Sequence, residues 1–533
     1  MKNKAYTVLL FLFVAMQQGS AQFWEHYYGT TMFYDYCAFT VNTNDKGYLV
    51  GASTKIYHGI QFVTLYRTSF NGDTLWTKLI RSHNDVQIID TKQTQDGGYI
   101  CLGFIYLGET GEESKPFIFK LNKCAEQEWC TIFETDRFLS WAQNIMQTDD
   151  GGYILTLNSY GDYDTENTFL VKLDATGNVL WGRPVIDHNR YADAYNPYSE
   201  RMLRTKNGDY LISGRVYWKN PFDDLIILRP FYALFDDEGN EKWLSPFGLA
   251  DTLFGSGWGC VELENGHFMC TARQLLGDSR LQFGLIIEWD KDGQLIHYKS
   301  VKPQEISPEC HSLFFIDILR MKEMYSLCMP YLTSFTQAYP AIISIDTSVF
   351  DTGFSIEALR IFYDKTEWLF INKTDDNKIL SVNHHRHSAY DRDFFIAKMN
   401  SMLVSDSLVQ DNRTYDSLCP HPITYSEIFI DSCRIVTVVN SLSIPENKPV
   451  LRPGFEVYPN PCIDKFTLSL SKEHDLDKIE VIASNIQGID YKKLIMTGTS
   501  PQTVDVSGWP KGMYIIRVFC NGASIGNQKL VIL

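Results

Sequence analysis

Aromatic side chains stand beside carboxylates and amides in two neighbouring stretches of the chain, residues 187–198 and 217–224. Rings of this kind stack on a sugar or a peptide while the polar groups fix its orientation, so the stretches are candidate binding loops. The alternative is that the rings only pack the two loops against each other. The candidate ligand-binding residues are Tyr191, Tyr195, Tyr198, Tyr217, Trp218 and Asp223.

The densest group of histidines lies at residues 383–387, and Asp391 and Asp393 follow it. Neutral imidazoles and carboxylates can ligate zinc or another transition metal. In a strand, however, successive side chains point to opposite faces, so His384 and His385 would point apart. We therefore expect a solvated loop here and no metal site.

Acidic turns at residues 236–239 and 290–293 lack the further oxygen ligands of a calcium loop, and turn chemistry explains their composition. The chain has no Gly-x-Ser-x-Gly elbow, no His-Glu-x-x-His, no P-loop and no dinucleotide fingerprint. We expect no cofactor. A carboxylate pair for glycoside hydrolysis comes from distant positions, so the sequence leaves enzymatic activity open.

The elements that position these loops are copies of one repeat. Its clearest copies contain Asp-Gly-Gly-Tyr, at residues 96–99 and 150–153. The hydrophobic anchors of the copies, spaced by 51 to 58 residues, are Tyr48, Tyr99, Tyr153, Tyr210, Phe268, Tyr325 and Ile379. A unit of this length is typical of a solenoid or a propeller.

Each repeat also contains a second turn out of phase with the first, clearest at residues 169–181. Apolar runs on both sides of a Gly, Asn or Asp turn indicate hairpins, so one repeat holds four short strands, as in a propeller blade. Trp24 precedes Tyr48 by the spacing seen in the other copies, whereas residues 394–408 lack a Trp. The first mature strand therefore completes the last blade and closes the ring. We predict an all-β, seven-bladed β-propeller over residues 22–440, with six or eight blades as alternatives.

The two faces of such a propeller differ. Both tight turns of each repeat lie on one face, while the loops of variable length lie on the other. Binding residues are usually carried by variable loops on a rigid scaffold, so we expect any site on the long-loop face.

The composition is that of a folded globular protein, with 44% hydrophobic and 21% charged residues. A net charge of −16 argues against nucleic acid or an anionic membrane as the main partner. Residues 1–21 read as a signal peptide, because Lys2 and Lys4 precede a short apolar core and small residues precede the expected cut. That core is too short to span a membrane, and we expect no transmembrane segment in the mature chain.

The 12 cysteines would then lie where disulfides form. Cys124 and Cys130 flank a predicted hairpin turn, and Cys419 and Cys433 bracket a short segment. Each pair is a candidate bridge, and the sequence leaves the connectivity open.

Three prolines mark residues 441–454 as a linker, and short alternating strands follow to the end of the chain. Residues 455–533 therefore predict a small Ig-like β-sandwich. Four motifs follow one another over this stretch, and they contain Pro459, Asn460, Pro461, Gly488, Gly512, Tyr514 and Lys529. In this order they resemble the type A C-terminal sorting domain of type IX secretion cargo.

The resemblance implies a type IX translocon as partner, removal of the domain on export, and delivery through the periplasm of a Gram-negative bacterium to the cell surface or the medium. Cys462 and Trp509 depart from the usual pattern, and Cys462 opens a pairing with Cys520. The body of the chain is similar to propeller-like regions found in front of such domains.

We expect a binding or adhesion module for a glycan or a protein. The alternatives are a secreted hydrolase or lyase acting on polysaccharide or peptide from the long-loop face, and a scaffold with no small-molecule site.

Overall fold

The computed structural model describes residues 23–437 and 455–533 apart from short gaps. The gaps are residues 30–32, 57–58, 108–112, 135–138, 161–165, 220–225, 248–254, 276–281, 335–336, 349, 351–353, 364, 389–390, 471–478, 486–489, 497–500 and 521–522. The predicted signal peptide and linker lie outside the described residues. Over the described ranges, no helix has the length and apolar character needed to cross a membrane.

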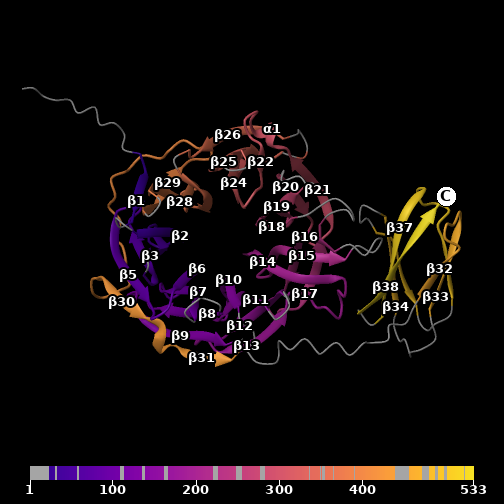
Figure 1. Cartoon of the computed structure of the whole chain (residues 1–533), viewed down its shortest axis with the longest axis horizontal. Helices are drawn as coiled ribbons and strands as arrows, with labels where there is room; N and C mark the ends of the chain where they lie inside the picture. The colour runs from indigo at the N-terminus through magenta and orange to yellow at the C-terminus, as the bar shows by residue number, and fades with distance from the viewer. Residues whose placement is uncertain are drawn as a thin grey trace, which may run out of the picture.

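The described chain is all-β except for α1 (Pro303–Ile306) and a short 3-10 turn at Ile430–Ser432. Most strands pair antiparallel with the next strand in the sequence, in successive groups. Figure 1 shows these groups arranged as a ring, with β2, β6, β10, β14 and β18 toward its centre. Parallel pairings of one residue pair, such as Tyr34 with Arg392 and Leu139 with Ser114, join the first strand of one group to the third strand of the group before it.

The groups follow one another around the ring in chain order. The first group contains β2 (Phe33–Asn42), β3 (Tyr48–Ile56), β4 (Gln61–Thr68) and β5 (Thr74–Arg81). The second contains β6 (Val86–Gln93), β7 (Tyr99–Leu107), β8 (Glu113–Leu121) and β9 (Gln127–Glu134). The third contains β10 (Leu139–Gln147), β11 (Tyr153–Tyr160), β12 (Glu166–Leu173) and β13 (Val179–Pro184). The fourth group contains β14 (Ala194–Arg204), β15 (Tyr210–Lys219), β16 (Ile226–Phe235) and β17 (Glu241–Pro246). The fifth contains β18 (Gly257–Glu262), β19 (Phe268–Leu275), β20 (Gln282–Trp289) and β21 (Leu295–Val301).

The remaining groups complete the ring. One contains β22 (Ser312–Leu313), β23 (Asp317–Arg320), β24 (Met324–Ser334), β25 (Gln337–Asp346) and β26 (Ile356–Ile361), and the last contains β27 (Lys365–Lys373), β28 (Ile379–Ser388), β29 (Asp391–Met399) and β1 (Glu25–Tyr28). In the last group, β1 comes from the start of the described chain and pairs antiparallel with β29, with Glu25 opposite Ala397. Trp24 is buried beside this seam, and its indole N–H donates to the Phe70 carbonyl at 2.8 Å.

Hydrophobic side chains fill the spaces between neighbouring groups. Along β7, Tyr99 and Cys101 pack into the core shared with the β2–β5 group, while Ile100 and Leu102 pack toward the β10–β13 group. This alternation follows from strand geometry, in which successive side chains leave opposite faces. Strands buried on both faces account for the continuous apolar runs in the repeat.

The turn of the repeat carries an ion pair as well as a tight bend. In the turn between β6 and β7, Asp96 accepts hydrogen bonds from Thr94 Oγ1 at 2.5 Å and from the Gly98 backbone N–H at 2.9 Å. Its second oxygen lies 2.8 Å from Nζ of Lys120, whose side chain is only 3% exposed. Asp150 with Lys172 and Asp376 with Lys398 repeat the arrangement in two other groups.

After β29 the chain returns along the outside of the first two groups as a strap, residues 409–437, which Figure 1 shows at the rim of the ring. Within the strap, β30 (Ser426–Phe429) pairs parallel with β5, and β31 (Arg434–Thr437) pairs parallel with β9. These strands cover the outer edges of two sheets, which would otherwise present unpaired backbone groups.

The four cysteines singled out from the sequence form two disulfides, but the candidate pairing within each sequence pair is wrong. The bonds are Cys124–Cys419 and Cys130–Cys433. The physical reason is the strap, which lies against the β6–β9 group and brings residues about 300 positions apart in sequence together. Both disulfides therefore fasten the strap to one group.

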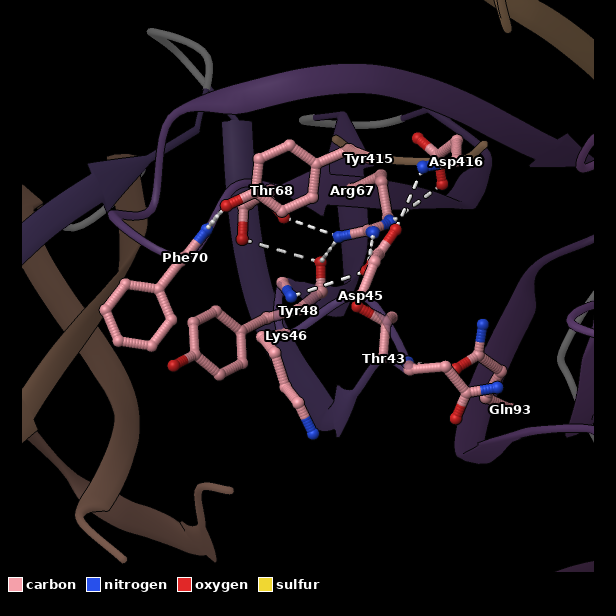
Figure 2. A network of polar contacts seen from close by, with 12 residues as sticks. Thr43, Asp45, Lys46, Tyr48, Arg67, Thr68, Phe70, Gln93, Tyr415 and Asp416 are labelled. Atoms are coloured by element: carbon pink, nitrogen blue, oxygen red, sulfur yellow. Dashed lines mark hydrogen bonds and ion pairs between the residues drawn. The ribbon is translucent and has the colours of Figure 1, made fainter. Parts of the chain in front are cut away.

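A buried arginine ties the strap to the β2–β5 group (Figure 2). Arg67 is fully buried, and its guanidinium pairs with Asp45 and, through Nε at 3.2 Å, with Asp416 of the strap. Asp416 also accepts a hydrogen bond from Trp76 Nε1 at 3.0 Å. Because two carboxylates neutralise the guanidinium, the burial of this charge is compensated.

The C-terminal residues form two further sheets with their own hydrophobic core, drawn beside the ring in Figure 1. One sheet has the order β32 (Phe455–Tyr458), β33 (Lys465–Leu470) and β36 (Gln502–Asp505). The other has the order β35 (Asp490–Met496), β34 (Ile479–Asn485), β37 (Gly512–Cys520) and β38 (Ala523–Ile532).

Candidate functional site

The candidate site is a ladder of side chains on one face of β14 and β15. Three cross-strand pairs share this face, namely Tyr195 with Tyr217, Tyr198 with Arg215, and Arg201 with Ser213. Two irregularities in β14 keep these pairs in step, since each adds a residue to β14 without moving the next side chain to the other face. Regular alternation along β15 then places all six side chains together.

The two outer residues of the ladder are the exposed ones. Tyr195 and Tyr217 are each 39% exposed although they stand in paired strands. Directly opposed side chains in an antiparallel pair lie close together, so the two tyrosines stand side by side on this face. Next to them, the Arg215 guanidinium lies 4.4 Å from the centre of the Tyr198 ring.

Tyr191 and Trp218 instead pack as structural residues. Their rings meet edge to face at 6.0 Å against the core beneath the β14–β17 group. The Tyr191 hydroxyl donates to Glu241 at 2.6 Å, and burial together with the Glu241 charge raises the pKa of Tyr191. Of the other predicted residues, Asp223 lies outside the described residues. The alternative stated from the sequence, that the rings only pack the loops, therefore holds for Tyr191 and Trp218, while Tyr195 and Tyr217 are exposed.

The ladder faces the next group around the ring. Ser213 Oγ donates to the backbone carbonyl of Trp258 on β18, and the Arg201 guanidinium lies 5.8 Å from the centre of the Trp258 indole. Arg201 also lies 5.8 Å from the ring of Phe370 on β27. It therefore reaches toward side chains from two other groups.

A third arginine continues the same region. Arg273 on β19 lies 5.0 Å from the centre of the Phe314 ring, and that ring lies 6.3 Å from Trp258. Burial, and next the positive charge of Arg215, lower the pKa of Arg273. We call Arg201, Arg215 and Arg273 the arginine cluster.

Sequence reasoning missed the arginine cluster, although a signal was present. Arg215 and Arg273 each stand five positions after the anchor of their repeat, Tyr210 and Phe268. Two charged residues at the same position of neighbouring apolar strands are unusual, because charges are rarely placed in a core without a partner or a task. Aligning the copies would have found them.

Two carboxylates accompany the cluster. Glu200 is 5% exposed, and its Oε1 lies 3.9 Å from Nη1 of Arg215. Burial raises the pKa of Asp317, which the charge of Arg201 opposes. The backbone N–H of Ile318 donates to Asp317 at 2.9 Å.

The histidine run lies on a strand and not in a solvated loop, so that expectation is wrong. Residues 383–387 belong to β28, whose pairing with β29 continues to Ser388 opposite Asp391. Asn383 and His384 are buried, at 1% and 6% exposed. Continued pairing, which the local composition does not reveal, keeps this segment extended.

Other polar groups of interest have local explanations. Asp236 and Asp290 accept backbone hydrogen bonds within their own turns. Cys124, Cys419 and His421 lie within metal-ligand distance of one another, but the two sulfurs are bonded to each other and offer no thiolate.

Two hollows lie near the strap and away from the ladder. One, of about 210 Å³, is bordered by Lys46, Tyr48 and Asp375 on the tight-turn face and by Arg413 of the strap. The other, of about 440 Å³, lies along strap residues 415–423 beside Trp76.

In the C-terminal sheets, the side chain of Asn460 bridges to the last strand. It donates to the Lys529 carbonyl and accepts from the Val531 N–H at 2.9 Å. Pro459 and Pro461 flank Asn460, and Gly512 begins β37. The Tyr514 hydroxyl donates to the Pro510 carbonyl at 2.8 Å, and its ring packs against Trp509.

Two further predictions fall partly outside the described residues. Gly488 is not among them. Cys462 is a buried free cysteine, and the side chain of Cys520 lies outside the described set.

Comparison with known proteins separates the two parts of the chain. Residues 456–533 match the model of the secretion system C-terminal sorting domain. No curated protein matches the chain.

Several solved structures share a coarse likeness. A polysaccharide lyase of a new family, an ulvan lyase, is 9% identical, with a TM-score of 0.46 over 70% of this chain and 95% of its own. Drosophila plexin A, solved with semaphorin 1b, is 9% identical, with a TM-score of 0.39 over 70% of this chain and 86% of its own. At this level the likenesses carry no argument about activity. Behind an all-β region, the chain carries the C-terminal sorting domain of type IX secretion cargo.

Proposed function

We propose that the chain is a secreted or cell-surface protein whose residues 22–440 form a seven-bladed β-propeller. The successive antiparallel groups support the blades, with six or eight as the alternatives, and the pairing of β1 with β29 supports closure by the first strand. In this proposal residues 1–21 are a signal peptide, residues 441–454 are a linker, and residues 455–533 engage the type IX translocon and are removed on export.

The function that the geometry supports best is glycan binding through the ladder on β14 and β15. The observation that carries this proposal is the Tyr195–Tyr217 pair, two adjacent exposed rings held by strand register. Aromatic faces backed by polar groups suit a sugar, whose apolar ring face and hydroxyls need both kinds of contact. The pair lies at the strand ends opposite the tight turns, where the sequence places the long loops.

The test is a glycan array probed with the full mature chain, followed by affinity measurement on each hit. Replacing Tyr195 and Tyr217 together by Ala should weaken binding at least tenfold, or about 1.4 kcal/mol, because both ring contacts are lost. Tyr298→Ala is the matched control, since Tyr298 is 54% exposed on the outer strand β21. Unchanged affinity in the double variant, or equal loss in the control, would refute the site.

The alternative is an enzyme acting on polysaccharide or peptide from the same face. Asp317 favours it, since burial raises the pKa of its carboxyl beside Arg201, as a general acid requires. Each glycan that binds on the array is incubated with the protein to decide between the two functions. A binding protein should leave the glycan intact. Cleavage of the glycan into shorter chains by the parent protein, but not by the Asp317→Asn variant, would identify an enzyme.

A further inference from the structure

The arginine cluster adds positive charge to the ladder where packing alone does not require it. Arg215 shares the face of Tyr195 and Tyr217, and Arg201 continues that face along β14. Arg273 enters from the next group. Three guanidinium groups therefore face at most two carboxylate charges, those of Glu200 and Asp317, and positive charge is left in excess.

The hydrogen-bond donors of this region are not all used. Nε of Arg273 and Nε1 of Trp258 are buried and make no hydrogen bond within the described part of the chain. A buried donor without an acceptor destabilises a fold, so such groups in one region call for an explanation. An incoming acceptor with a negative charge would satisfy both the donors and the excess charge.

The aromatic surroundings define how the arginines are presented. Tyr198 lies under Arg215, and Phe314 lies under Arg273. Stacking on a ring fixes the plane of a guanidinium, and Arg273 presents an N–H edge whose Nε makes no hydrogen bond within the described residues. That edge matches the two oxygens of a carboxylate or a sulfate group, which it binds in bidentate fashion.

We propose that the ladder selects an anionic glycan, one whose sugars carry carboxylate or sulfate groups, with Tyr195 and Tyr217 stacking on a sugar ring and Arg273 and Arg215 holding the acidic group. This inference rests on the proposed glycan-binding function and adds to it the class of ligand. The protein as a whole is acidic, with a net charge of −16, so the attraction is local to this cluster.

The experiment measures the affinity of the full mature chain for three probes of equal length: an oligogalacturonate, a sulfated neutral oligosaccharide and the same oligosaccharide without sulfate. We expect one or both anionic probes to bind at least tenfold more tightly than the neutral probe. Raising the salt from about 0.05 M to about 0.5 M should weaken only the anionic binding, because salt screens charge.

Variants separate the two layers of the proposal. Arg273→Gln should lower affinity for the anionic probe at least tenfold and leave affinity for the neutral probe unchanged. Arg273→Lys should give an intermediate loss, because it keeps the positive charge but lacks the two parallel N–H donors of a guanidinium. Arg183→Gln, which removes a charge on the outer strand β13, is the matched control, and unchanged melting temperatures confirm folding.

The outcomes are distinguishable. Equal binding of neutral and anionic probes that depends on Tyr195 and Tyr217 overturns this inference and keeps the glycan-binding function. An Arg273→Gln variant that binds like the parent also overturns it. Absence of binding to both anionic probes overturns this inference, whereas only a glycan array without any hit refutes the glycan-binding function.

Discussion

At the scale of single residues, a buried lysine in three of the groups depends on the aspartate of the adjacent turn. Lys120 is 3% exposed and touches Asp96 and Glu128, at 2.8 and 3.2 Å. Lys172 with Asp150 and Lys398 with Asp376 have the same relation. Removing one partner of a buried pair leaves an uncompensated charge, whereas exposed pairs contribute little. The turn and the strand are therefore coupled by electrostatics as well as by backbone geometry.

This coupling predicts an acid sensitivity. Burial would raise the pKa of Asp96, but hydrogen bonds from Lys120, Thr94 and the Gly98 N–H outweigh it and lower the pKa. A carboxyl with a lowered folded-state pKa contributes stability above its unfolded pKa of about 4 and loses it as the pH falls through the folded value. We expect stability to fall below about pH 4 and Asp96→Asn to weaken that dependence.

The same variant has a test at neutral pH. Asp96→Asn retains an oxygen for the turn but removes the charge that faces Lys120, so denaturant unfolding at pH 7 should show a loss of about 1–3 kcal/mol. The control is Asp149→Asn, since Asp149 pairs with Arg204 while 80% exposed and should have little effect. Equal losses in the two variants would contradict the special role of the buried pair.

At the scale of elements, local sequence predicts turns and strands well and long-range contacts poorly. The Gly-containing turns predict the hairpins, and the spacing of Trp24 from Tyr48 leads to the expectation that the first strand joins the last repeat, where β1 pairs with β29. The connectivity of the disulfides and the two strands of the strap depend on where a segment of irregular sequence lies in space. The sequence alone contains no period that would locate them.

The candidate site divides in the same way. Composition alone pointed to Tyr195 and Tyr217 but did not separate them from Tyr191 and Trp218. Exposure depends on which strand face a residue occupies, and for Tyr191, which precedes β14, on how it packs against Trp218. Strand register supplied that distinction. Only the structure places Arg273 in the arginine cluster, because Arg273 lies on β19 in a neighbouring group.

The strap supplies a prediction at this scale. Replacing Cys130 and Cys433 by Ala should lower the free energy of unfolding by about 2–4 kcal/mol, because this bond, with Cys124–Cys419 intact, closes a loop made of residues 124–130 and 419–433. Thermal unfolding with and without a reducing agent measures the effect. Reduction should destabilise the parent protein more than the double variant, which retains only the Cys124–Cys419 bond. Equal sensitivity of the two proteins would show that the Cys130–Cys433 bond adds no stability.

At the scale of the whole molecule, the sorting domain and the ring have separate cores. The C-terminal core includes Val457, Phe466 and Tyr514, and the described core clusters of the ring contain none of these residues. Separate cores mean that removal of one part leaves the packing of the other intact.

Export therefore has a direct test. Deleting residues 455–533 should leave a folded protein in the periplasm, because the signal that engages the translocon is lost while the ring remains. Fractionation of cells that express the truncated and full chains measures this, with Arg183→Gln in the full chain as a delivery control. Surface delivery of the truncated chain would contradict the role of the sorting domain.

The route by which the chain leaves the ring has a mechanical consequence. The last described residues before the C-terminal domain belong to β31, just after Cys433, and not to β29 beside the seam with β1. Tension applied to the tail would therefore reach the pairing of β31 with β9 first and the Cys130–Cys433 crosslink next, and both pass the load to the β6–β9 sheet. The hydrogen bonds that hold β1 to β29 are spared, so the protein can be pulled from behind without being unzipped.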